Sequence, residues 1–252
     1  MHDSSFQGWR KLLRVAASSN PSIERTRNGG ARLRRSVKVS GAVVCRSCQT
    51  LDLMNTSALL AKGHELAAWL EQEVHNLSAP ASLRTRCSAP CFIVAQEHHA
   101  AILSLLEQKQ PFFATAFALV RPVYESLVRG LWLQHCATDA EVQTFSVGGR
   151  PPNVPALLAA IKQTPAYSSG LLSTVYAQSW DAMCSYTHTG SHQIQRWNTG
   201  DAIQSNYADS EVAEVLSSTG AFALISLLGL ATVAANDTLV QRATERMRAW
   251  AT

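Results

Sequence analysis

The feature that most constrains the fold of this chain is a long uncharged segment near its end. No Asp, Glu, Lys or Arg occurs between Glu214 and Asp237. A helix of that length can cross a membrane, but this segment is rich in Ser, Thr, Gly and Ala and lacks basic clusters and aromatic anchors at its ends. A helix that is apolar on every side is also typical of the centre of a helical bundle. We therefore predict a central core helix and no association with a membrane.

The rest of the chain after Met54 has the periodicity of amphipathic helices. Apolar residues recur at helical spacing, and neither alternating β-branched residues nor hairpin turns interrupt them. Pro122 lies inside one such run, between Phe112 and Cys136, and should kink that helix near Val120. We predict an all-α fold, a helical bundle of about five long helices with short helical inserts.

The positive charge of the chain is concentrated in its first residues. The net charge is +4, but residues 1–53 carry ten basic and three acidic residues, so the remainder is mildly acidic. We predict a basic, disordered head over residues 1–53 and a single helical bundle domain over residues 54–252. Residues 20–31 resemble the translated recombination sequence of bacterial mobile gene cassettes, which implies a protein that begins at Met54. The head lacks the apolar stretch of a signal peptide, so we expect a cytoplasmic protein.

Motifs of several common enzyme classes are absent from the sequence. It contains no Gly-x-Gly-x-x-Gly, no Walker loop and no Gly-x-Ser-x-Gly elbow, which excludes most nucleotide-binding proteins and hydrolases. The cysteine pairs 45/48 and 87/91 are too far apart in the chain for an ordinary zinc ribbon. No Glu-x-x-His pair occurs, which excludes a ferritin-like di-iron centre. The leading interpretation therefore includes no cofactor and no metal.

Three charged residues share one face of the helix that contains Pro122. Arg121, Glu125 and Arg129 are spaced i, i+4 and i+8, so their side chains lie one above another on a largely apolar helix. A charge beside a core must be paired or reach solvent, because an unpaired buried ion costs several kcal/mol. Two interpretations stay open, namely an ion-pair ladder that fixes helix packing and a pocket for an anionic ligand.

A turn rich in histidine follows the next long helix. His188 and His192 would be one helical turn apart, but Gly190 between them weakens the helical geometry. With a third histidine they could hold one metal ion; otherwise His188 ends a helix, where the helix dipole favours a cationic ring. We predict a polar ligand-binding pocket formed by Arg121, Glu125, Arg129, His188 and His192.

Residues 121–139 resemble a family of uncharacterised all-helical bacterial proteins. The shared pattern is Arg-Pro-x-x-Glu-x-x-x-Arg-Gly-x-Trp-Leu-x-x-Cys-Ala-Thr-Asp, followed later by His-Thr-Gly, which here starts at His188. More loosely, the bundle is similar to the HEPN superfamily, which includes metal-independent ribonucleases with an Arg-x(4–6)-His motif. Arg129 and His135 have this spacing, and Gly130 stands where a polar residue usually follows the arginine.

The HEPN-like resemblance implies a ribonuclease of the defence or toxin type, or an RNA-binding protein. Its catalytic residues would be Arg129, which stabilises charge on the phosphate, and His135, which handles the proton of the ribose 2′-hydroxyl. The expected partners are RNA or an anionic small ligand and a second copy of the chain in a homodimer. Two other classes stay open: a non-catalytic interaction or small-ligand-binding protein, and a metal-dependent bundle enzyme that uses His188 and His192.

Overall fold

The described part of this chain is built from helices. The computed structural model describes residues 46–75, 77–199 and 202–251. Over these residues there is no β-strand, only an isolated bridge between Asn198 and Ile203, so the all-α prediction is confirmed. The long helices are α2 (Arg46–His75), α3 (Leu83–Leu106), α5 (Val120–His135), α8 (Leu171–Thr187), α10 (Asp209–Val233) and α11 (Asp237–Trp250). The short ones are α4 (Phe113–Ala118), α6 (Asp139–Ser146), α7 (Val154–Ile161), the 3-10 turn η1 (Pro165–Tyr167) and α9 (Ser191–Gln195).

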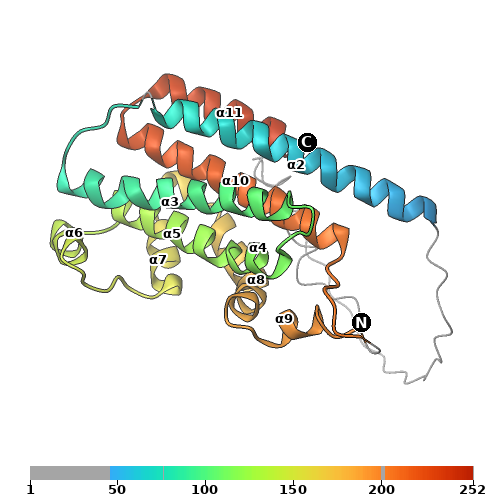
Figure 1. Ribbon diagram of the computed structural model, residues 1–252. Coiled ribbons are helices and arrows are strands. Elements are labelled where there is room, and N and C mark those ends of the chain that lie inside the picture. The colour runs from blue at the N-terminus through green and yellow to red at the C-terminus, as the bar shows by residue number, and fades with distance from the viewer. Residues whose placement is uncertain (1–45, 76, 200–201, 252) are drawn as a thin grey trace, which may run out of the picture.

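Helix α10 forms the centre of the bundle, as its uncharged sequence predicts. It packs against α2, α3, α5 and α11 (Figure 1). Among the described helices, α10 alone has the length and hydropathy of a membrane span, and 78% of its most apolar stretch is buried inside the protein. The prediction of a core helix is confirmed.

Two glycines allow α5 and α10 to approach α3 closely. A Cβ atom at Gly130 in α5 would lie 2.7 Å from Phe92 Cε1, and one at Gly229 in α10 would lie 2.5 Å from Phe92 Cζ. Phe92 of α3 is fully buried, so its ring fills the space between the three helices. Gly130 therefore serves helix packing.

A break between α4 and α5 at Leu119 matches the kink predicted from Pro122. Proline has no N–H to donate to the carbonyl of Ala118, one turn earlier. The hydroxyl of Thr187 in α8 lies 3.1 Å from that carbonyl oxygen and 2.8 Å from Met183 O, and can donate to either. The Ala118 carbonyl, which receives no backbone hydrogen bond from Pro122, can instead accept one from Thr187. This contact keeps the end of α8 beside the start of α5.

Most of the predicted head, residues 1–45, lies outside the described residues, including the segment that resembles a mobile cassette. Helix α2 begins at Arg46 rather than near Met54. The helical conformation therefore starts inside the segment that the charge pattern assigns to the head.

Candidate functional site

Glu125 holds together the charged face of α5. Its Oε1 accepts a hydrogen bond from Arg121 Nε at 2.6 Å, and its Oε2 lies 3.6 Å from Arg129 Nη2. The side chains of Arg121, Glu125 and Arg129 are 22%, 23% and 30% exposed, so the ladder lies at the surface of the bundle and not in its core. Each carboxylate oxygen faces a different guanidinium, which leaves the face with one excess positive charge.

Arg121 is the residue that links this face to α8. Its Nη1 lies 2.6 Å from His188 Nε2, and its guanidinium lies over the Trp180 ring, 4.6 Å from the ring centroid. A guanidinium only donates hydrogen bonds, so His188 Nε2 accepts this one, and Nδ1 is the nitrogen that carries the ring proton. One cation therefore contacts a carboxylate, an aromatic ring and an imidazole.

The α8 side of the site is aromatic. The rings of Tyr176 and Trp180 lie one helical turn apart, with centroids separated by 4.8 Å, and both are partly exposed. His188 comes eight residues, or about two helical turns, after Trp180. This spacing at multiples of four is the only feature of the sequence that could have placed Tyr176 and Trp180 beside His188. The signal is weak, because aromatic residues at helical spacing usually belong to a core. We call the following residues the Arg121 cluster: Arg121, Glu125, Arg129, Tyr176, Trp180 and His188.

The two histidines of the predicted pocket lie on opposite sides of the break between α8 and α9. Helix α8 ends at Thr187, Thr189 has a φ of 55°, and α9 begins at Ser191, so the helical geometry between His188 and His192 is interrupted, as Gly190 indicates. His188 contacts Arg121. The backbone N–H of His192 donates to Ser185 Oγ at 2.9 Å, and its ring lies 6.3 Å from that of Tyr186. The contacts that define the cluster therefore include His188 and not His192.

The predicted catalytic residues Arg129 and His135 point in different directions from α5. On a regular helix they are about 9 Å apart along the axis and about 120° apart around it. His135 is the last residue of α5, its ring lies 5.9 Å from that of Tyr167, and burial lowers the pKa of its imidazole. Arg129 faces Glu125. Their joint action at one phosphate stays a prediction, and these contacts do not support it.

Cys91, which forms a pair with Cys87 in α3, lies near Arg129 of the Arg121 cluster. Cys91 Sγ donates to Cys87 O at 3.4 Å, and burial raises the pKa of the Cys91 thiol to about 11, although the charge of Arg129 opposes that rise. At neutral pH Cys91 is therefore a protonated thiol. Within the described ranges, no three His, Cys, Asp or Glu side chains are grouped so that they could hold a metal ion.

Comparison with known proteins places most of the chain in one family. The model of a family of unknown function (DUF6988) matches residues 92–251, which is more than half of the chain and includes the whole Arg121 cluster. Helix α2 lies outside the match. No curated protein and no solved structure matches the chain.

Proposed function

We propose that this chain, which belongs to the DUF6988 family of unknown function, binds single-stranded RNA at the Arg121 cluster. The observation that carries the proposal is the contact of one guanidinium, that of Arg121, with both the ring of Trp180 and the imidazole of His188. This arrangement places a phosphate-binding cation beside aromatic rings. Proteins that bind single strands without sequence preference combine these two features.

The charges of the cluster favour a phosphodiester. Arg121 and Arg129 carry two positive charges, and Glu125 balances one of them. The distance of 3.6 Å between Arg129 Nη2 and Glu125 Oε2 is longer than a good hydrogen bond, so the partly exposed Arg129 retains N–H donors for a ligand. Arginine presents these donors in a planar fork that matches phosphate oxygens.

The aromatic pair favours a nucleotide over a simple inorganic anion. Stacking of a base on an aromatic side chain contributes about 1–3 kcal/mol and tolerates any base. Tyr176 and Trp180 are partly exposed on the same face of α8 as His188. A base stacked on them would carry its phosphate to the guanidinium of Arg121.

Ribonuclease activity of the HEPN-like type is a stronger form of the proposal. The resemblance to HEPN ribonucleases assigns the contact with the phosphate to Arg129 and the proton transfer to His135. Within the cluster, His188 is the imidazole in contact with a guanidinium. Its Nε2 can act as a general base once a bound phosphate takes over the hydrogen bond from Arg121. We therefore propose that cleavage at this site needs no divalent metal and depends on His188.

The proposal is tested by titrating the full chain into a short fluorescent RNA in the presence of EDTA. Arg121→Gln and Trp180→Leu should each weaken binding about tenfold, a loss of about 1.4 kcal/mol. The matched control is Arg248→Gln, which removes the same charge from an exposed position of α11 and should change binding little. Contact with two phosphates predicts a slope of log K against log salt of about −1.4, and Arg121→Gln should reduce it by about half.

Equal losses in Arg121→Gln and Arg248→Gln would mean attraction by net charge alone and would refute a site at the cluster. If RNA does not bind but pyrophosphate raises the melting temperature of the wild type and not of Arg121→Gln, the protein binds a small anionic ligand instead. Cleavage is read from the same mixtures on a denaturing gel. Loss of cleavage in His135→Gln but not in His188→Gln would restore Arg129 and His135 as the catalytic pair.

A further inference from the structure

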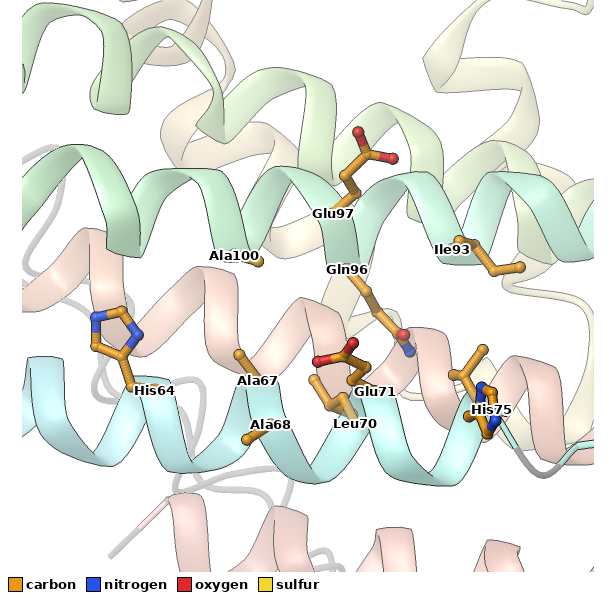
Figure 2. A pocket seen from close by; sticks show the side chains of 11 residues that line it. His64, Ala67, Ala68, Leu70, Glu71, His75, Ile93, Gln96, Glu97 and Ala100 are labelled. Carbon is orange, nitrogen blue, oxygen red and sulfur yellow. The ribbon is translucent and has the colours of Figure 1, made fainter.

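A groove between α2 and α3 forms a second candidate site, built by helices other than α5 and α8. Its walls are the stretch of α2 from His64 to His75 and the stretch of α3 from Ile93 to Ala100, and its volume is about 690 Å³. Figure 2 shows the two helices side by side with α10 behind them, in agreement with the packing of α10 against both. Small-molecule sites usually have volumes of about 300–1,000 Å³.

Apolar side chains supply most of the surface of the groove. Leu70 and Val74 of α2 and Ile93 of α3 line it, together with three alanines, and of these Leu70 is buried. Ile93 is 42% exposed, although isoleucine is among the residues most often buried. Exposed apolar surface gathered in a hollow with a polar rim is typical of a binding site.

Two of the polar groups that line the groove are carboxylates, and the others are one amide and two imidazoles. Glu71 of α2 and Gln96 of α3 lie near its middle, and His64 and His75 lie toward its two ends, whereas Glu97 points away from α2 (Figure 2). Among the described residues, no Lys or Arg lines the groove. Within the described residues no side chain forms an ion pair with Glu71.

The end of the groove at His64 carries a further carboxylate. His64 Nε2 lies 3.1 Å from Glu107 Oε2. A carboxylate therefore lies next to the imidazole at this end, although Glu107 itself does not line the groove.

We propose that this groove binds an organic cation, a small molecule with an amine or quaternary ammonium group and an apolar body. The cation pairs with Glu71, and the apolar body covers Ile93 and the partly exposed Val74. An anionic ligand would face the carboxylate of Glu71, and a neutral apolar ligand would remove that carboxylate from water without a partner, which is costly. This site is independent of the RNA proposal, because it shares no residue with the Arg121 cluster.

The test uses rhodamine 6G, a fluorescent apolar cation, with the anionic dye fluorescein for comparison, each titrated with the full chain. Rhodamine 6G should bind saturably and fluorescein should bind much more weakly. Glu71→Gln should weaken rhodamine 6G binding about fivefold, equivalent to about 1 kcal/mol. Glu65→Gln, which removes the same charge from an exposed position of α2 outside the groove, should leave it unchanged.

A second pair of variants tests the place of binding by filling the groove. Ala68→Trp should abolish rhodamine 6G binding, and Ala61→Trp, at another exposed position of α2 that does not line the groove, should not. The proposal is overturned if rhodamine 6G does not saturate, if fluorescein binds as tightly, or if Ala68→Trp binds like Ala61→Trp with an unchanged melting temperature. Should Ala68→Trp fail to fold, the comparison of Glu71→Gln with Glu65→Gln decides.

Discussion

Glu125 determines how two arginines can lie side by side on α5. Its replacement by alanine leaves Arg121 and Arg129 without their shared carboxylate. Because all three side chains reach solvent, the loss should be smaller than the ~3–5 kcal/mol of a broken buried pair. We expect Glu125→Ala to lower the free energy of unfolding in urea by about 1–2 kcal/mol, more at low salt than at high salt. A loss no larger than that of Glu65→Ala on the exposed face of α2 would show that the ladder contributes nothing to stability.

His99 is a buried histidine whose contacts fix its tautomer. Its Nδ1 lies 3.0 Å from Thr219 Oγ1, and that hydroxyl donates to Val215 O at 2.8 Å, so Nδ1 is the donor. Among the described residues, Nε2 of His99 is buried and has no hydrogen-bond partner. Burial, and to a smaller extent the charge of His64, lowers the pKa of His99 to about 4.

This pKa predicts a loss of stability in acid. The pKa of an unfolded histidine is about 6.5, so between pH 6.5 and pH 4 the unfolded chain binds more protons than the folded one, and the free energy of unfolding falls as pH falls. At about 1.4 kcal/mol per pKa unit, His99 should account for a loss of about 3 kcal/mol by pH 4. His99→Gln should be less stable at pH 7 but lose less stability between pH 7 and pH 4.5 in urea unfolding. Parallel pH profiles for the two proteins would contradict this account.

At the scale of helices, the packing of α3, α5 and α10 depends on Phe92 and the glycines that face it. Alanine forms helices better than glycine by about 1 kcal/mol, yet Gly130→Ala would place a methyl group 2.7 Å from Phe92 Cε1. We expect Gly130→Ala to destabilise the protein by about 1–3 kcal/mol. In a double-mutant cycle, Phe92→Leu should recover part of that loss, because the smaller side chain leaves room for the methyl group. Stabilisation by Gly130→Ala, or strict additivity, would contradict this packing.

The elements that sequence predicted well are those with local causes. The core position of α10 follows from its lack of charge, and the break at Leu119 follows from the missing N–H of Pro122. The contact between Arg121 and His188 could not be predicted in the same way, because it depends on how α8 packs on α5, and in particular on Thr187 beside the carbonyl of Ala118. Trp180 was not singled out, because the sequence alone does not tell which side of α8 is covered.

At the scale of the whole molecule, charge separates the two proposed sites. The chain has a net charge of +4, and residues 1–53 carry ten basic and three acidic residues, so this segment also attracts RNA. The Arg121 cluster has an excess of positive charge, whereas the groove between α2 and α3 has Glu71 near its middle and, among the described residues, no Lys or Arg in its lining. We therefore expect the two sites to bind ligands of opposite charge. Because residues 1–53 also attract RNA, an affinity measured for the whole chain does not show where the RNA binds.

The measurement that most directly tests the central claim is photo-crosslinking of the full chain to a short single-stranded RNA, with the modified residues identified by mass spectrometry. The account predicts saturable crosslinks at Tyr176 or Trp180, because these rings are proposed to stack on bases beside Arg121. The same crosslinks should decrease strongly in Arg121→Gln and persist in Arg248→Gln. Crosslinks confined to residues 1–53, or to helices other than α5 and α8, would contradict the proposal that the Arg121 cluster binds RNA.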